Sequence, residues 1–372
     1  MTTDSLSGDT LPADAVPAGG LPAGGLDAEI LTRRDGVAGI ISLNRPKAIH
    51  ALTLGMSESM SHALAAWADD AEVKAVMIEH SEGRGFCSGG DINLLRRSAL
   101  EDHGIEGRRF FRAEYQLNHQ LFIYDKPVVA FMDGVTMGGG VGISQPAPFR
   151  VATEHTRFAM PETGIGLFPD VGGGWYLSRL DGRLGQFLAL TGARLDGAEC
   201  LWAGLATHYL PSEALPEAKR RIAAGHEIGG VLGALSDKAP EPRIAAHAAQ
   251  IRKHFAFDTL EQVLASLESD DSEWAARELA TLRTKSPQAC KIALRQLATS
   301  LTLDNFAQNM AMEYRIGSHV LVLPDFAEGV RAVIVDKDHT PKWNPSTPED
   351  VTEDMLDAIF APLAPEDEWR PI

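Results

Sequence analysis

Residues 27–213 alternate between stretches with strand-type and helix-type hydrophobic patterns. Two alternating stretches flank Asp35-Gly36, a dipeptide typical of a hairpin turn. Residues 51–69 have helical periodicity, and the segments "KAVMIEH", "KPVVAFMDG", "FRVAT" and "RFAM" have the apolar content of buried strands. Strands that alternate with helices predict a layered α/β core over residues 27–213.

The regions on either side of this predicted core have different sequence patterns. Residues 214–363 form successive helical stretches separated by Pro, Ser, Asp or Gly, which predicts a helical C-terminal region followed by a short tail over 364–372. Residues 1–26 contain "VPAGGLPAGGL", a composition too poor in large apolar residues to build a core, and we expect a disordered tail there. The helical region could cover the core's own pocket or mediate assembly into a homo-oligomer.

Composition and charge restrict the classes of function. The 372 residues are 44% hydrophobic and 23% charged, as in an ordinary soluble protein, and no apolar run is long enough for a membrane span. The net charge of -17 argues against a nucleic-acid partner, since such binding depends on Lys and Arg contacts to phosphates. The three cysteines show no CxxC spacing and the N-terminus is acidic, unlike an export signal, so we expect free thiols and a cytoplasmic protein.

Two glycine-rich turns are candidates for function. The segments "GRGFCSGGD" and "DGVTMGGGVG" each follow a predicted strand, and neither matches a phosphate-binding loop. Such turns can expose two backbone N–H groups as an oxyanion hole, or they can simply be tight turns against the sheet. Cys87 fits a thiol nucleophile elbow, but the polar "SEGRG" separates it from the preceding strand, which favours a buried structural thiol.

Several motifs, taken together and in order, resemble the crotonase (enoyl-CoA hydratase/isomerase) superfamily. They are "RGFCSGGDI", "GVTMGGGVGIS", "FRVATE", "FAMPETGIGLFPDVGGGWYLSRL", "LALTGARL" and "AGLATHY". The "FPDVGGG" segment and "FAEGVRAVIVDKDHTPKWNP" resemble the 3-hydroxyisobutyryl-CoA hydrolase branch. The resemblance implies a ββα spiral core and a thioester hydrolase that cleaves this acyl-CoA in valine breakdown, with an enoyl-CoA hydratase or isomerase as the alternative. It implies no metal and no cofactor, because CoA is part of the substrate.

The resemblance also implies roles for individual residues. The backbone N–H groups of Cys87 and Gly139 would hold the thioester carbonyl, and Glu162 of "MPE" and Asp170 of "FPD" would be the catalytic acids. Read from the residues alone, Pro161-Glu162 is also a common helix opening. Hydratases of the superfamily carry a second glutamate where this chain has Gly142, so the resemblance disfavours hydration.

Glu114 is a third acid of interest. It lies on one helical stripe with Phe110, Leu117 and Leu121, all apolar. A carboxylate inside an apolar stripe is rarely left unpaired, so an ion pair with an arginine from another element is one interpretation. The resemblance implies the other, a glutamate that contacts the substrate.

Overall fold

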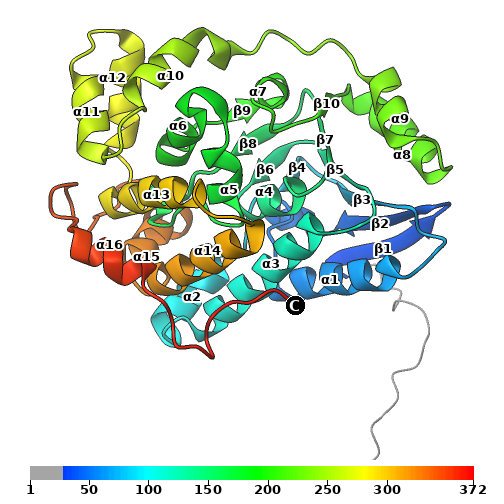
Figure 1. The fold of residues 1–372 in the computed structure, drawn as a ribbon, viewed down its shortest axis with the longest axis horizontal. Helices are drawn as coiled ribbons and strands as arrows, with labels where there is room; N and C mark the ends of the chain where they lie inside the picture. The colour runs from blue at the N-terminus through cyan, green and yellow to red at the C-terminus, as the bar shows by residue number, and fades with distance from the viewer. Residues whose placement is uncertain (1–27) are drawn as a thin grey trace, which may run out of the picture.

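The structure is a computed structural model that describes residues 28–372 (Figure 1). The tail expected over residues 1–26 therefore lies outside the described residues. The strands are β1 Ile30–Asp35, β2 Ala38–Leu43, β3 Ala75–His80, β4 Gly85–Cys87, β5 Val128–Met132, β6 Val135–Met137, β7 Phe149–Ala152, β8 Arg157–Ala159, β9 Leu195–Asp196 and β10 His208–Tyr209.

These strands form two sheets. The six-stranded sheet has the order β1-β2-β3-β5-β7-β10, and the four-stranded sheet has the order β4-β6-β8-β9. Strands β1 and β2 pair antiparallel, with Asp35 opposite Ala38, which confirms the hairpin predicted at Asp35-Gly36. The remaining neighbours pair parallel, except β8 with β9.

The chain builds both sheets together as a spiral. It adds β3 to the large sheet and β4 to the small one, and the pairs β5/β6 and β7/β8 repeat this step with helices between them. Parallel neighbours cannot be joined by a tight hairpin, so each turn of the spiral needs a long connection. The predicted ββα spiral core is confirmed.

The helices fill these connections and the C-terminal region. They are α1 Leu54–Ala68, α2 Ile92–Glu101, α3 Ile105–Phe122, α4 Gly139–Ser144, α5 Gly173–Ser178, α6 Leu184–Thr191, α7 Gly197–Trp202, α8 Leu215–Ala223, α9 Ile228–Leu235, α10 Ala248–His254, α11 Leu260–Glu268, α12 Glu273–Leu282, α13 Pro287–Ser300, α14 Phe306–Val320, α15 Pro324–Val330 and α16 Glu353–Phe360. Many begin after a residue whose side chain accepts a hydrogen bond from the first turn, including Thr53, Ser272, Ser286, Asn305 and Thr352. The helical C-terminal region is confirmed.

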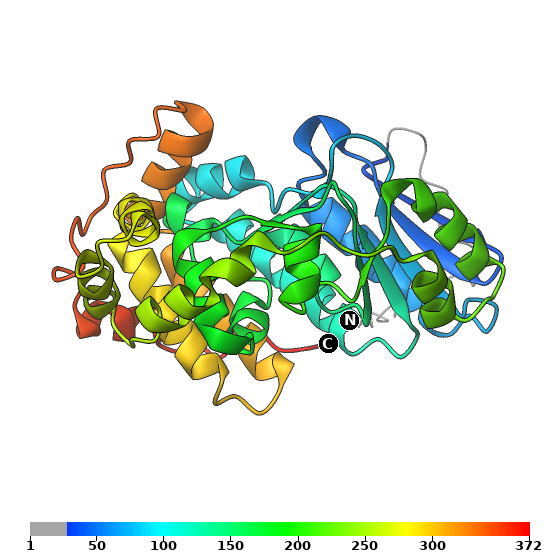
Figure 2. The same cartoon turned by 90° about the horizontal axis from the view of Figure 1, so that it is seen from above.

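The large sheet is covered on both faces. Helices α8 and α9 pack on one face, where Ile40, Met77 and Phe131 of the strands meet Leu215 and Val231 of the helices. Figure 2 shows this pair of helices beside the strands, away from the other C-terminal helices. None of the described helices combines the length and apolar character needed to cross a bilayer.

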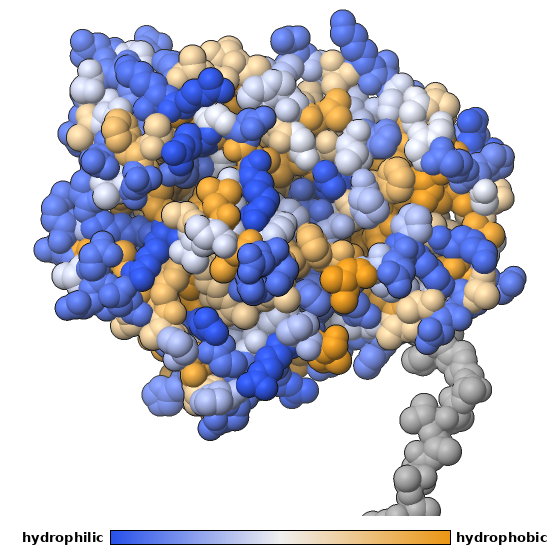
Figure 3. Space-filling model, viewed as in Figure 1, coloured by the Kyte–Doolittle hydropathy of each residue, from blue (hydrophilic) through white to orange (hydrophobic). Residues whose placement is uncertain are grey.

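The remaining C-terminal helices share the main core with the spiral. A single apolar cluster contains Val76 and Met132 of the sheet together with Leu297 and Met310 of α13 and α14. The C-terminal tail also packs against this body, since Trp369 is buried and the carboxylate of Glu368 pairs with Arg315 at 2.9 Å. Hydrophilic side chains cover most of the face seen in Figure 3, with scattered apolar patches, as the high net charge predicts.

Candidate active site

A cavity of about 530 Å³ brings most of the predicted site residues together. Its lining includes Glu114 of α3, Gly139 at the start of α4, Glu162, and Asp170 in the loop before α5. Side chains from the C-terminal region, Lys285 and Ile334 among them, line the same cavity. The helical region therefore covers the core's own pocket, which is one of the two roles that its sequence left open.

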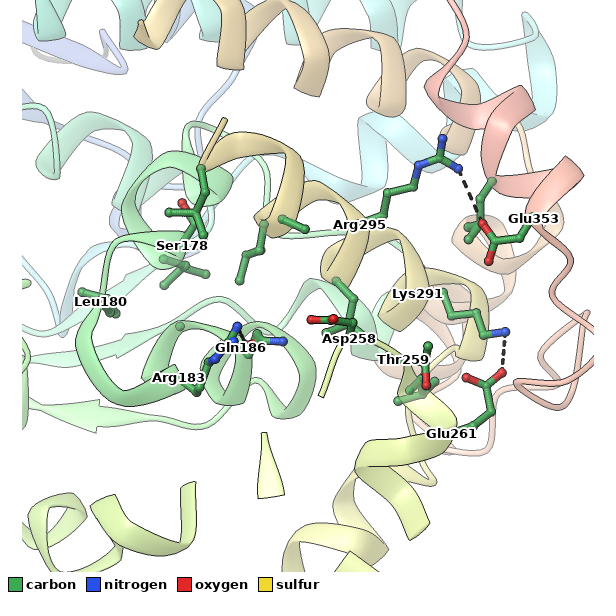
Figure 4. A pocket seen from close by; sticks show the side chains of 18 residues that line it. Ser178, Leu180, Arg183, Gln186, Asp258, Thr259, Glu261, Lys291, Arg295 and Glu353 are labelled. Carbon is green, nitrogen blue, oxygen red and sulfur yellow. Dashed lines mark hydrogen bonds and ion pairs between the residues drawn. The ribbon is translucent and has the colours of Figure 1, made fainter. Parts of the chain in front are cut away.

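A second cavity, of about 380 Å³, lies between α6, α11, α13 and α16 and contains none of the predicted site residues (Figure 4). Its cations already have partners. Lys291 pairs with Glu261 at 2.5 Å, and Arg295 pairs with Asp357 at 2.6 Å and faces Glu353. The first cavity, by contrast, contains carboxylate oxygens of Glu114 and Glu162 that have no hydrogen-bond partner among the described residues.

Two backbone N–H groups in the first cavity are available to a ligand. None of the described residues accepts a hydrogen bond from the N–H of Gly90 or of Gly139. The two groups are close, because a Cβ built on Gly139 would lie 3.3 Å from the carbonyl carbon of Gly89, which is bonded to the nitrogen of Gly90. The first N–H groups of a helix have no intrahelical partner, which accounts for Gly139. This pair has the form of an oxyanion hole.

Cys87 does not line this cavity, whereas Ser88, Gly89 and Gly90 do. Its side chain is buried inside β4, its carbonyl oxygen packs against Gly140, and burial raises the pKa of its thiol to about 12. The candidate N–H donor is therefore Gly90 and not Cys87, which lies three residues earlier in the same turn. A buried structural thiol is the reading of Cys87 that agrees with this geometry.

Glu162 begins a short 3-10 helix, Glu162–Ile165, and its carboxylate lies in the cavity. A Cβ built on Gly138 would lie 3.2 Å from Glu162 Oε1, so the carboxylate lies against the peptide that supplies the Gly139 N–H. The other oxygen, Oε2, is buried and has no hydrogen-bond partner among the described residues. The local helix opening is present, and the side chain nevertheless faces the cavity.

Glu114 also lies close to this peptide. A Cβ on Gly139 would overlap Glu114 Oε1, and this oxygen has no hydrogen-bond partner among the described residues. The nearest arginines in sequence bind elsewhere: Arg109 faces Glu58, and Arg112 donates to the carbonyl of Glu368. No ion pair to Glu114 occurs within residues 28–372, so the ion-pair interpretation does not describe this structure.

Asp170 completes the group of acids, and its position depends on a residue that the sequence did not single out. The hydroxyl of Tyr115 donates a hydrogen bond of 2.8 Å to Asp170 Oδ2, and both side chains are buried. Tyr115 follows Glu114 but points in a different direction around α3, about 100° away. No pattern in the sequence indicates this contact, which arises only when the loop of Asp170 packs against α3.

The space around Gly142 is closed. A Cβ at this position would lie 2.7 Å from the Cβ of Val171 and 2.8 Å from Asn118 Nδ2, too close for real atoms. The amide of Asn118 is fully buried and lacks a hydrogen-bond partner among the described residues. A larger side chain at 142 would therefore require both neighbours to move. Asn118 lies one helical turn after Glu114, a spacing that the sequence could have suggested.

Burial controls the ionisation of the three carboxyls, whose residues are only 1–5% exposed. Burial, reinforced by the charges of Asp170 and Glu162, raises the pKa of Glu114 well above its usual range. Burial and the charge of Asp170 do the same to the pKa of Glu162. Burial raises the pKa of Asp170 to about 6, and the Tyr115 hydroxyl limits this rise. Burial therefore disfavours the charged form of all three carboxyls, and the Tyr115 hydrogen bond offsets part of this effect at Asp170.

The structure thus combines a ββα spiral core with one cavity in which two available N–H groups lie beside buried carboxyls. The family model described as enoyl-CoA hydratase/isomerase matches residues 38–360, and the chain belongs to this family.

Curated relatives of this chain are similar over nearly their whole length. The 3-hydroxyisobutyryl-CoA hydrolase of Xenopus tropicalis is 43% identical over 355 residues, which cover 92% of this chain and 91% of the relative. The human protein of the same name is 41% identical, with coverage of 91% and 90%. A solved structure described as a carnitinyl-CoA dehydratase from Mycobacterium thermoresistibile is 39% identical, with a TM-score of 0.87 and coverage of 91% and 98%. One described as an enoyl-CoA hydratase from Rhodobacter sphaeroides is 37% identical, with a TM-score of 0.85 and coverage of 92% and 99%.

The expected cytoplasmic location is wrong by this comparison. The hydrolases of Xenopus tropicalis, rat and human are all named as mitochondrial proteins. The expectation depended on the acidic N-terminus and on three cysteines, which the structure shows buried and free. Free thiols show only that no disulfide forms, and they do not distinguish one reducing compartment from another.

The raised pKa values predict how stability depends on pH. A carboxyl whose pKa is raised by folding contributes its full stability below the unfolded value, and this stability is lost as the pH rises towards the folded value. Glu114→Gln removes a charge that burial disfavours and breaks no hydrogen bond at Oε1. We expect its melting temperature to exceed that of the wild type at pH 8, by about 2–4 °C per kcal/mol of penalty removed, and the gap to close towards pH 4.

Thermal melts from pH 4 to pH 8 measure this effect. Glu217→Gln is the control of opposite sign, because its exposed carboxylate accepts hydrogen bonds from Arg220 and Arg221, which lower its pKa to about 2. A Glu114→Gln protein less stable than the wild type at pH 8 would show that Glu114 is held as a stabilising anion.

Proposed function

We propose that this protein hydrolyses 3-hydroxyisobutyryl-CoA to 3-hydroxyisobutyrate and CoA. The observation that carries the proposal is the pairing of Glu162 and Asp170 in one cavity with two available N–H groups, while Gly142 leaves no second glutamate beside them. Relatives more than 40% identical over nine-tenths of the chain carry the name of this hydrolase, which supports the same substrate.

The N–H groups of Gly90 and Gly139 would bind the thioester carbonyl oxygen. Attack on the carbonyl carbon moves negative charge onto this oxygen, and two preorganised donors stabilise it more than they stabilise the ground state. Loss of one such donor typically costs about 2.7–4 kcal/mol of transition-state stabilisation. The thioester carbon then lies beside the Glu162 carboxylate, because Glu162 contacts the peptide that carries the Gly139 N–H.

Glu162 would initiate the reaction in its ionised form. As a nucleophile it forms a mixed anhydride and expels CoA as a thiolate, and water then opens the anhydride. As a general base it removes a proton from water, whose oxygen attacks the thioester and displaces the same thiolate. Both routes end with the free acid and CoA, and both use the same pair of N–H groups. A base with a raised pKa is stronger once ionised, so activity should rise with pH through that pKa.

The other two acids would hold the acyl group. The raised pKa of Glu114 favours its protonated form, which can donate a hydrogen bond to the substrate. Asp170 accepts the Tyr115 hydrogen bond on Oδ2, and its other oxygen can accept a hydrogen bond from the β-hydroxyl of the acyl chain. This hydroxyl would therefore lie between a donor and an acceptor, which favours hydroxyacyl over simple acyl thioesters.

Hydration of an enoyl-CoA is the second candidate, because two similar solved structures carry the names of a dehydratase and a hydratase. Their names support the fold and an acyl-CoA substrate, whereas the packing around Gly142 in this chain supports hydrolysis over hydration. Hydration uses a second glutamate at the position of Gly142, where Asn118 and Val171 occupy the necessary space.

Substrate selectivity tests the proposed function. We expect CoA release from 3-hydroxyisobutyryl-CoA to exceed release from isobutyryl-CoA by about 10-fold or more, since only the former has the hydroxyl that Asp170 and Glu114 would bind. Crotonyl-CoA should not be hydrated. Thiol release and crotonyl-CoA absorbance measure the two reactions in parallel. Faster consumption of crotonyl-CoA than release of CoA from the hydroxyacyl thioester would rule out the hydrolase.

Substitution of Glu162 separates catalysis from local structure. Glu162→Gln keeps the shape of the side chain and removes the ionisable group, so we expect kcat to fall by about 10²–10⁴-fold. The melting temperature should not fall, because burial already disfavours the charge that is removed. Steady-state kinetics and a thermal melt give both values. Retention of more than about a tenth of the wild-type turnover would remove Glu162 from the chemistry.

A further inference from the structure

The turn that carries Asp170 has a strained backbone. Val171 has a φ of 52° and Gly172 a φ of 88°, so two successive residues occupy the left-handed region. Glycine adopts this region easily, but for a β-branched residue such as valine it is a genuine outlier. A strained conformation of this kind persists only where the surrounding structure holds it in place.

Glu313 of α14 supplies the main constraint on this turn. Its carboxylate accepts hydrogen bonds from the N–H of Gly172 at 2.6 Å and from the N–H of Gly174 at 2.9 Å, one on each oxygen. Backbone N–H groups that a turn directs to one side form a concave site for an anion. Glu313 is fully buried, although it lies 143 positions after Asp170 in the chain.

Neighbouring side chains extend the constraint to the residue before Asp170. The amide of Gln296 donates to Glu313 Oε1 at 3.0 Å and to the carbonyl of Pro169 at 2.7 Å, and Asn309 donates to Glu313 Oε1 at 2.9 Å. Within the turn, the N–H of Gly173 donates to the carbonyl of Asp170 at 2.6 Å. The backbone on both sides of Asp170 is therefore attached to α13 and α14.

We propose that Glu313 is a positioning residue for Asp170. Its carboxylate holds the strained turn in the conformation that directs Asp170 into the cavity, while Tyr115 orients the Asp170 carboxylate from the other side. Glu313 does not line the cavity and acts through the backbone of the turn. This inference rests on the proposed function, in which Asp170 contacts the acyl group, and gives α14 a role in the reaction.

The positioning role of Glu313 requires a carboxylate rather than an amide. Each oxygen of Glu313 accepts a hydrogen bond from a different backbone N–H. A glutamine presents one oxygen and one NH₂ group, so either Gly172 or Gly174 would face another donor. Glu313→Gln therefore disturbs the turn with almost no change in volume. A misplacement of about 1 Å in a catalytic group can cost about 100-fold in rate.

The test compares Glu313→Gln with Glu199→Gln. Glu199 is also buried and also accepts two backbone hydrogen bonds, from Asp196 at 2.8 Å and Ile244 at 3.1 Å, but it lies outside the cavity. With 3-hydroxyisobutyryl-CoA we expect Glu313→Gln to lower kcat by about 10- to 100-fold and to change KM by less than about threefold. Glu199→Gln should lower the melting temperature and leave kcat within about twofold.

A double-mutant cycle with Asp170→Asn distinguishes positioning from general destabilisation. If Glu313 acts through Asp170, Glu313→Gln should reduce kcat by less than about threefold in the Asp170→Asn background. An equal loss in both backgrounds would overturn the proposal. Should Glu313→Gln fail to fold, Gln296→Met, which removes the donor to Pro169 at similar volume, enters the same cycle with the same expectation.

Hydrogen exchange tests the attachment without reference to activity. The amides of Gly172 and Gly174 should exchange at least about 10-fold faster in Glu313→Gln than in the wild type, and they should be unchanged in Glu199→Gln. Unchanged exchange at both glycines in Glu313→Gln would overturn the proposal even if kcat fell. If wild-type protein fails to cleave 3-hydroxyisobutyryl-CoA, the proposed function fails alone. The cycle is then run with whichever of isobutyryl-CoA and crotonyl-CoA the wild-type protein converts.

Discussion

The cost of burying carboxyl groups is the constraint on which this structure depends. Glu114, Glu162 and Asp170 lie in one cavity with little access to water, and no arginine or lysine neutralises them among the described residues. A protein tolerates such a group only if the acids share protons or find donors. Here Tyr115 stabilises the negative charge on Asp170, and the pKa values of the two glutamates rise. The charged form of each acid is therefore disfavoured by burial, and the hydrogen bond from Tyr115 offsets part of this cost at Asp170.

The spiral topology brings these groups together. Each turn contributes a strand to each sheet, and the segments that follow β4 and β6 meet at Gly90 and Gly139. Glycine at position 139 lets this peptide approach Gly89 and the Glu114 carboxyl, which a side chain would prevent. At Gly142 the side chains of Asn118 and Val171 occupy the space that a larger residue would need. Close packing around these two glycines thus exposes the N–H of Gly139 and excludes a large side chain at position 142.

The C-terminal helices are part of the site and not a separate layer around it. They share the apolar core of the spiral, place Lys285 and Ile334 in the wall of the cavity, and hold the Asp170 turn through Glu313 and Gln296. Strained turns are common at functional sites because surrounding contacts can supply the free energy that holds them. Helices α13 and α14 hold the turn from a distance. They keep Asp170 in place without using residues that contact the substrate.

The sequence alone determined the local elements, because hydrophobic period and turn residues act over a few positions. The hairpin at Asp35-Gly36, the buried strands and the helical region after residue 214 follow from such patterns, and motif order indicated the family and the acids Glu162 and Asp170. Only the tertiary structure showed that Gly90 and not Cys87 presents an N–H to the cavity. Both residues belong to the same glycine-rich motif, so the motif alone does not say which of its N–H groups faces the cavity. The tertiary structure also decided that Glu114 lacks an arginine partner, and that Tyr115 and Glu313 hold Asp170 from α3 and α14. These contacts join residues 55 and more positions apart, and only the packing of the whole chain brings them within hydrogen-bond distance.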